Sequence, residues 1–174
     1  SLHDALPILH LCDAALPALV SGDKTVLDLM KGFKRIQLNL EYMDAGRALD
    51  PAALAARVRA LPQWEFIIQY GKKYKHFLSA FDDVPNHAVL FDGSAGEGVV
   101  PGAWPKPLDG HACGYAGGLN PDNMQKNLEA IAQAVPPDYI TWVDQETGAR
   151  TDDKFDLAKV RRVLAIAVPY ARGA

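Results

Sequence analysis

The stretch that decides the fold is His111-Ala-Cys-Gly-Tyr-Ala-Gly-Gly-Leu-Asn-Pro-Asp-Asn123. It reads as a short apolar strand, a glycine turn and the start of a helix. Asn120 suits the N-cap of this helix, and Pro121 suits its first helical position. Asp122 suits the positive end of the helix dipole. Backbone N–H groups at such a turn can hold an anion of the size of phosphate. The stretch therefore predicts a strand-turn-helix unit with an anion site at Gly117 and Gly118.

A second stretch of the same form follows, Tyr139-Ile-Thr-Trp-Val-Asp-Gln-Glu-Thr-Gly-Ala-Arg-Thr151. Asp144 ends its strand, and Thr147 with Gly148 offers a hydroxyl and backbone donors. Arg150 could pair with a phosphate group. The same residues also suit an ordinary turn into the last helix. Two glycine turns on consecutive strand-helix units are stronger evidence for an anion site than either turn alone.

Strands and helices alternate along the 174 residues. Short apolar runs predict six strands, which are Ile8–Cys12, Arg35–Leu40, Glu65–Tyr70, Ala88–Asp92, His111–Tyr115 and Tyr139–Asp144. Helical spacing of apolar residues predicts the segments between and after them, which are Lys24–Lys31, Pro51–Ala60, Lys72–Phe81, Pro121–Ala134 and Phe155–Val168. This alternation is typical of an α/β fold with a parallel sheet.

Two parallel architectures fit these elements, an open α/β sheet or a (β/α)8 TIM barrel. A complete barrel usually needs at least about 200 residues. The chain has no initiator Met and runs at once into an apolar strand, which favours a barrel that lacks its first two units. We therefore expect one partial TIM-barrel domain over residues 1–174, with about six of the eight βα units, and a leader over residues 1–8 that is not native.

Composition excludes several classes of function. A formal charge of −3 with scattered Lys and Arg gives no reason to expect nucleic-acid binding, and no apolar run reaches the length of a membrane span. Cys12 and Cys113 read as reduced, buried thiols of a cytoplasmic protein. No His and Glu spacing matches a zinc helix motif, so we expect neither a metal nor a cofactor.

The chemistry is expected beyond the carboxyl ends of the strands, because ligands bind there in both parallel architectures. Asp92 ends a buried strand and is followed by the glycine-rich loop Gly93–Gly110, so it can serve as a general acid or base. It could instead cap that loop through the backbone N–H groups. A long glycine-rich loop favours the catalytic interpretation. His10 and His111 lie within predicted strands and read as core residues.

These residues resemble a known family. Phe91-Asp92 with its glycine loop, Ala116–Asn123 and Val143–Gly148 are similar to the last three βα units of phosphoribosylanthranilate isomerase, a phosphate-binding (β/α)8 barrel of tryptophan biosynthesis. The resemblance implies that Asp92 is the general acid. It also implies which residues hold the phosphate: Gly117, Gly118, Thr147 and Gly148.

The sequence also departs from the family. The family's general base is a Cys on its first strand, whereas Cys12 would fall on the third. Asn39 replaces a His on the fourth strand, although Gln37-Leu38 before it is similar to the family's pattern. Arg150 replaces a Glu. We therefore expect this chain alone to be inactive.

Three hypotheses remain open. The first is an isomerase that performs an Amadori rearrangement on a small phosphorylated substrate, with four further candidate contacts at Asn39, Gln69, Asp144 and Arg150. The second is a non-catalytic or regulatory barrel that binds phosphate. The third is a divergent aldolase or epimerase, although no predicted strand carries a Schiff-base Lys. The sequence leaves the oligomeric state open.

Overall fold

The computed structural model describes residues 7–40, 49–70, 75–92 and 100–171. These residues divide into an N-terminal unit, up to Leu90, and a C-terminal unit, from Phe91 onward. The prediction of a single domain over residues 1–174 is not tested by this division. Of the predicted leader, residues 1–6 lie outside the described residues, and Ile8 begins the first strand.

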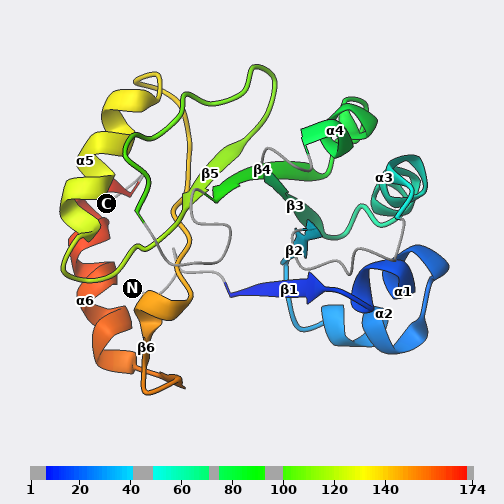
Figure 1. Ribbon diagram of the computed structural model, residues 1–174, viewed down its shortest axis with the longest axis horizontal. Helices are drawn as coiled ribbons and strands as arrows, with labels where there is room; N and C mark the ends of the chain where they lie inside the picture. Colours follow the sequence, from blue (N-terminus) through cyan, green and yellow to red (C-terminus); the bar gives the residue numbers. More distant parts are fainter. Residues whose placement is uncertain (1–6, 41–48, 71–74, 93–99, 172–174) are drawn as a thin grey trace. The chain divides into compact units, whose positions relative to one another are not determined.

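The N-terminal unit alternates strands with helices (Figure 1). Its elements are β1 (Ile8–Cys12), α1 (Ala15–Ser21), α2 (Lys24–Met30), β2 (Arg35–Asn39), α3 (Pro51–Arg59), β3 (Glu65–Tyr70), α4 (Lys75–Leu78), a 3₁₀ turn (Ser79–Phe81) and most of β4 (His87–Asp92). The last two residues of β4 belong to the C-terminal unit. The first three strands are parallel, with Ile8 opposite Arg35 and Arg35 opposite Glu65. The predicted strands and their parallel direction are confirmed here.

One face of these strands forms the core of the N-terminal unit. Leu11, Ile36, Leu38 and Phe66 are buried there together with the helical residues Met30, Leu54 and Val58. Removing an aliphatic side chain of this size from water contributes about 1.5–3 kcal/mol. The apolar face therefore fixes which side of the sheet the helices cover.

Local capping agrees with the sequence at α3. The Asp50 carboxylate accepts a hydrogen bond from the Ala52 N–H at 3.0 Å, and Pro51 occupies the first turn. Helix α1 was not predicted, because it is short and contains Pro17. Pro17 lies in the first turn of α1, where the missing N–H removes no helical hydrogen bond.

The C-terminal unit has shorter elements. They are β5 (Cys113–Ala116), α5 (Met124–Ala134), a 3₁₀ turn (Thr147–Ala149), β6 (Arg150–Thr151), β7 (Lys154–Phe155), α6 (Leu157–Ala167) and a last 3₁₀ turn (Val168–Tyr170). Helices α5 and α6 lie side by side in Figure 1. Leu119, Met124 and Val163 form the buried cluster of this unit.

Two predictions for this unit are wrong in detail. The predicted strand Tyr139–Asp144 is reduced to one parallel bridge, between Val143 and Tyr115. Phe155 lies not in the last helix but in an antiparallel hairpin, where it is 71% exposed. Asp156 caps the helix that follows, since its carboxylate accepts from the Ala158 N–H at 2.9 Å.

The order of the strands decides between the two architectures. The sheet runs β1-β2-β3-β4-β5, in the order of the chain. An open doubly wound sheet reverses its strand order at a switch point, whereas a (β/α)8 barrel adds each strand beside the previous one. The bridge from Tyr115 to Val143 continues the same order in the same direction. This sheet is that of an α/β barrel.

Candidate functional site

The candidate site begins at the carboxyl ends of β4 and β5 and of the bridge at Val143. Asp92 is the last residue of β4 and is half-buried. Gly117 follows β5 directly, and Asp144 follows the bridge. The Asp144 N–H donates to the Tyr115 carbonyl at 2.9 Å. All of these residues belong to the C-terminal unit.

Both glycines of the turn after β5 have backbone conformations that side chains avoid. Gly117 has φ 124° and Gly118 has φ 59°. Only glycine adopts such angles at little cost. Gly117 is also buried. The glycine pair is therefore required by the path of the backbone at the end of the strand.

Two asparagine side chains hold this turn. The Asn120 Oδ1 atom accepts from the Asp122 N–H at 2.9 Å and from the Asn123 N–H at 3.3 Å. The Asn123 amide donates to the Gly118 carbonyl at 2.8 Å, and its Oδ1 accepts from the Asn120 N–H at 2.9 Å. Asn120 thus caps the first turn as predicted, but the α-helix proper starts later, at Met124.

The second predicted turn touches the first. A Cβ atom placed on Gly148 would lie 2.0 Å from the Leu119 carbonyl oxygen and 3.1 Å from the Asn120 Cα atom. No side chain fits there. Thr147, beside this contact, is exposed and begins the 3₁₀ turn. The structure therefore places Gly148, one of the residues predicted to hold phosphate, against Leu119, which directly follows the glycine pair Gly117 and Gly118.

Arg150 is exposed on the strand that follows. Its guanidinium donates to Glu146 Oε1 at 2.9 Å, and 42% of its side chain is exposed. An ion pair this exposed contributes roughly 0–1 kcal/mol. Glu146 therefore competes only weakly with an anionic ligand for Arg150.

Asn39 and Gln69 belong to the N-terminal unit, at the ends of β2 and β3. Both are buried, and so is Gln37. The Gln37 amide donates to Asn39 Oδ1 at 2.6 Å, and Asn39 Nδ2 lies 3.4 Å from His10 Nδ1. Side chains alternate along a strand, so this polar row lies on the face opposite the apolar core. Sequence reasoning singled out Asn39 and missed its hydrogen bond with Gln37.

An aromatic cluster built on Phe91 lies on the face of β4 opposite the Asp92 side chain, because consecutive side chains of a strand point to opposite faces. The Phe91 ring stacks on Tyr115 at a centroid distance of 5.5 Å, and Trp104 meets Tyr115 edge-on at 5.7 Å. The Tyr115 hydroxyl donates to the Pro105 carbonyl at 2.8 Å. Burial, with a smaller contribution from Cys113, raises the pKa of Tyr115 to about 12. The cluster therefore presents a neutral, apolar surface next to the strand end.

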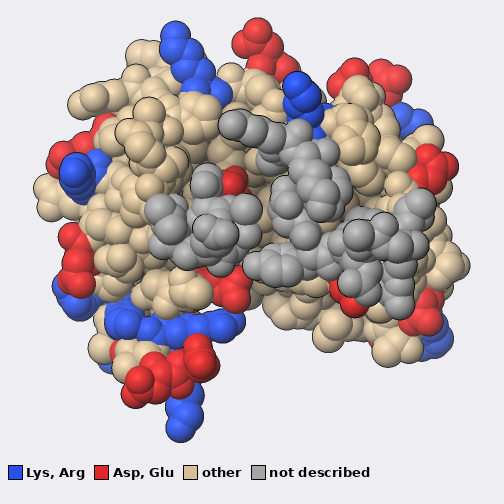
Figure 2. Space-filling model, in the orientation of Figure 1, with Lys and Arg blue, Asp and Glu red and all other residues tan. Residues whose placement is uncertain are grey.

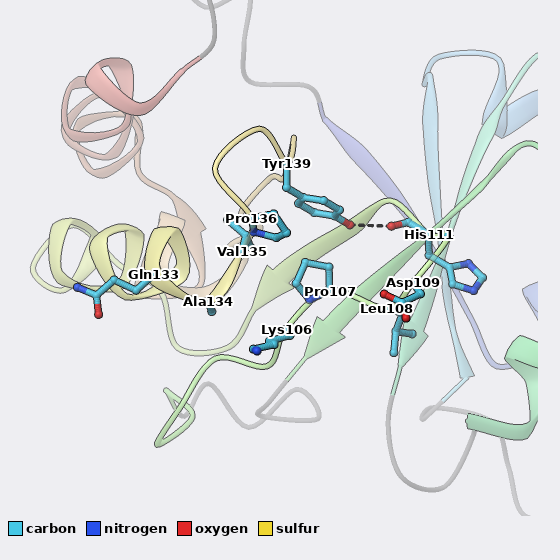
Figure 3. A pocket seen from close by; sticks show the side chains of 11 residues that line it. Lys106, Pro107, Leu108, Asp109, His111, Gln133, Ala134, Val135, Pro136 and Tyr139 are labelled. Carbon is cyan, nitrogen blue, oxygen red and sulfur yellow. Dashed lines mark hydrogen bonds between the residues drawn. The ribbon is translucent and has the colours of Figure 1, made fainter.

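A pocket of about 640 Å³ lies at the opposite end of β5 (Figure 3). His111, Pro136 and Tyr139 line it together with the last turn of α5. His111 precedes β5 and is half-exposed, so the prediction that it lies within a strand is wrong. The Tyr139 hydroxyl donates to the His111 carbonyl at 2.7 Å and accepts from the Cys113 N–H at 2.6 Å. Burial is the largest of the causes that raise the pKa of Tyr139.

The distribution of charged and metal-ligating side chains in the described residues indicates no further site. Lys and Arg are interspersed with Asp and Glu on the face shown in Figure 2. Within residues 7–40, 49–70, 75–92 and 100–171, no three His, Cys, Asp or Glu side chains gather as metal ligands would. In the same ranges, no helix has the length and apolar content needed to cross a bilayer.

The fold matches a solved structure. The crystal structure of phosphoribosyl anthranilate isomerase from Thermus thermophilus aligns with a TM-score of 0.55 over 94% of this chain and 86% of that chain, at 20% sequence identity. No family model and no curated protein matches the sequence. At this identity the match establishes the fold alone. The chain has a phosphoribosylanthranilate isomerase-like α/β fold, as the resemblance predicted.

Proposed function

We propose that this chain is a sugar-phosphate isomerase of the phosphoribosylanthranilate isomerase type. The observation that carries the proposal is the contact of Gly148 with Leu119, beside the glycine turn that follows β5. It joins two predicted phosphate turns within one unit, to which Asp92 also belongs. The match to the Thermus thermophilus isomerase supports the same assignment through the fold.

The phosphate group is proposed to sit in the two joined turns. The backbone N–H groups of Gly117, Gly118 and Gly148 and the Thr147 hydroxyl are its donors. Because Asn120 and Asn123 already fix the backbone around Gly118, little ordering remains to oppose binding. Hydrogen bonds to a charged group contribute about 1.5–3 kcal/mol each.

Asp92 is proposed as the general acid. In an Amadori rearrangement an acid protonates the ring oxygen of the ribose, which opens the ring, and a base then removes the proton at C2. A carboxyl group at the end of a strand suits the first step. Asp144 and Arg150, which belong to the same unit as Asp92, are proposed to contact the rest of the substrate. The proposal leaves removal of the C2 proton to a group that these residues do not supply.

Asp92→Asn tests the acid, since it keeps the shape of the side chain and removes the proton. In a protein that also supplies the missing base, we expect turnover of phosphoribosylanthranilate to fall about 100-fold or more, while ribose 5-phosphate binds as before. Calorimetry gives the affinity and substrate consumption gives the rate. Equal and measurable turnover with and without the substitution, in the presence of the base, would refute the role of Asp92.

Thr147→Val tests the phosphate site, because it replaces the hydroxyl by a methyl group of similar size. We expect the Kd for ribose 5-phosphate to rise about tenfold, as loss of one hydrogen bond to a charge predicts. Thr25→Val, on α2 of the other unit, is the matched control and should leave the Kd unchanged. Ribose without a phosphate group should bind to the Thr147→Val and Thr25→Val variants with the same Kd.

The second candidate is a non-catalytic barrel that binds phosphate. Two observations favour it: Asn39 stands at the position of a family His, and Arg150 is paired with Glu146. This candidate predicts ribose 5-phosphate binding that depends on Thr147 with no turnover in any variant. The two experiments above therefore separate it from the isomerase.

A further inference from the structure

A chain of hydrogen bonds runs from the loop after β4 to the glycine turn. The Trp104 indole N–H donates to Asn127 Oδ1 at 3.2 Å. The Asn127 amide donates to the Asn123 carbonyl at 2.9 Å. The Asn123 amide in turn donates to the Gly118 carbonyl at 2.8 Å. All four residues belong to the C-terminal unit.

Asn127 is an unusual residue for its position. It is 6% exposed, on the face of α5 that also buries Met124 and Ile131. Asn is a poor helix former, and burial of its amide costs free energy unless both polar atoms are bonded. An Ala or a Leu would suit helix packing better. Both ends of this amide are used, and each joins a different segment.

Trp104 is fixed on its other sides as well. Its ring meets Tyr115 edge-on, and the Tyr115 hydroxyl bonds to the Pro105 carbonyl. The segment Trp104–Pro105 is therefore anchored both to β5 and, through Asn127, to α5. This segment belongs to the loop that separates Asp92 from β5.

We propose that Asn127 is a positioning residue that couples the position of the Trp104 side chain to anion binding at the glycine turn. This inference rests on the proposed phosphate site. Asn127 holds the carbonyl of Asn123, and the Asn123 side chain holds Gly118, so each group is kept in place by the next. Coupling between two sites is reciprocal. Phosphate bound at the turn therefore stabilises the hydrogen-bonded position of Trp104 by the same factor by which this position of Trp104 strengthens phosphate binding.

The first experiment follows the Trp104 indole N–H by ¹H–¹⁵N NMR during a titration with inorganic phosphate. Trp104→Phe assigns its resonance by removing it. We expect this resonance to shift along the saturation curve. The Trp64 indole, which donates to the Met30 carbonyl in the N-terminal unit, is the internal control and should stay in place.

The second experiment measures the Kd for inorganic phosphate in three variants. Asn127→Leu and Trp104→Phe should each raise it about fivefold, the lower end of usual coupling factors. Asn127→Asp keeps an oxygen acceptor for Trp104 and loses the donor to Asn123. It should raise the Kd as Leu does, while the Trp104 indole stays hydrogen-bonded. Gln133→Ala, exposed on the same helix, should change nothing.

Failures of the two proposals are distinguishable. Tight phosphate binding with an unmoved Trp104 indole and unchanged Kd values overturns the coupling and leaves the phosphate site intact. If the unmodified chain binds no phosphate, the phosphate site is wrong. The chain of hydrogen bonds is then tested without ligand, through the NMR resonance of the Gly118 amide. If Trp104→Phe does not shift this resonance, the positioning role of Asn127 is refuted. Trp104→Phe keeps an aromatic ring, so it serves where an Asn127 variant fails to fold.

Discussion

The two ends of β5 are both fastened to the segment that follows α5, but by different means. At the Ala116 end the backbone of Gly148 packs directly on Leu119, and asparagine amides hold the glycine turn. At the Cys113 end one phenol, that of Tyr139, bridges two backbone groups. The first arrangement packs backbone on backbone, whereas in the second a side chain bonds to the backbone.

This difference agrees with the general roles of the two ends of the strands in α/β barrels. Loops at the carboxyl ends of the strands carry ligand sites, and the amino ends carry stability. The pocket at the Cys113 end does not alter this division (Figure 3), because the Tyr139 hydroxyl beside it is already bonded to both neighbours. Changes at the Cys113 end should therefore affect stability alone, whereas changes at the Ala116 end should also affect ligand binding.

The largest effect is expected at Gly148. Gly148→Ala places a methyl group 2.0 Å from the Leu119 carbonyl oxygen, so the two turns must move apart. We expect a loss of about 3 kcal/mol in the free energy of unfolding, the upper end for overpacking, together with weaker phosphate binding. Urea unfolding and a ribose 5-phosphate titration measure the two effects.

Gly102→Ala is the matched control for this change. Nothing lies within 4 Å of a Cβ atom at Gly102, which belongs to the same unit. It should leave both the stability and the affinity unchanged. Equal stability of the two variants would mean that the turns do not pack as closely as described.

A smaller effect, on stability alone, is expected at the other end of β5. Tyr139→Phe removes the donor to the His111 carbonyl and leaves the Cys113 N–H without its acceptor. An orphaned buried donor costs about 1–3 kcal/mol, so we expect a loss of about 2 kcal/mol on urea unfolding. The Kd for ribose 5-phosphate should not change.

Tyr170→Phe is the control for loss of a hydroxyl. Tyr170 is exposed, and its hydroxyl lies 3.5 Å from Glu129. This variant should unfold like the unmodified chain. A change of ligand affinity in Tyr139→Phe would erase the distinction between the two ends of β5.

The regular part of the fold could be predicted because its signals are local. Strands β1, β2 and β3 are apolar runs whose core face is set by alternation, and Asp50 with Pro51 marks the start of α3. The strand predicted over Tyr139–Asp144 does not form, because tertiary contacts override its local pattern. Its Tyr139 and Thr141 side chains bond to the backbone beside β5, and only Val143 keeps a bridge.

The candidate site could be predicted only as separate pieces. Asp92 and the glycine pair follow apolar strands, and that local pattern predicts a functional strand end. The contact between Gly148 and Leu119 joins residues far apart in the sequence, and no local pattern encodes it. Asn127 reads as an ordinary surface residue of a helix, since burial of its amide depends on Trp104 packing against it.

The smallest effect is expected from pH, at the middle of β5. In the folded chain Tyr115 keeps its proton up to a pKa of about 12, whereas the unfolded chain releases it near the ordinary tyrosine pKa of about 10. The folded state therefore binds more protons between these values, and stability must fall as the pH rises from 10 to 12. Over the one pH unit from 10 to 11 we expect a loss of about 1 kcal/mol.

Tyr115→Phe sharpens this last comparison. Near neutral pH it loses the hydrogen bond to the Pro105 carbonyl, which costs about 1 kcal/mol. Above pH 10 its stability should fall less steeply than that of the unmodified chain, and the remaining slope comes from Tyr139, whose pKa is also raised. Urea unfolding at pH 8, 10 and 11 gives the slopes. An unchanged slope in Tyr115→Phe would mean that the phenol is as accessible to solvent in the folded chain as in the unfolded one.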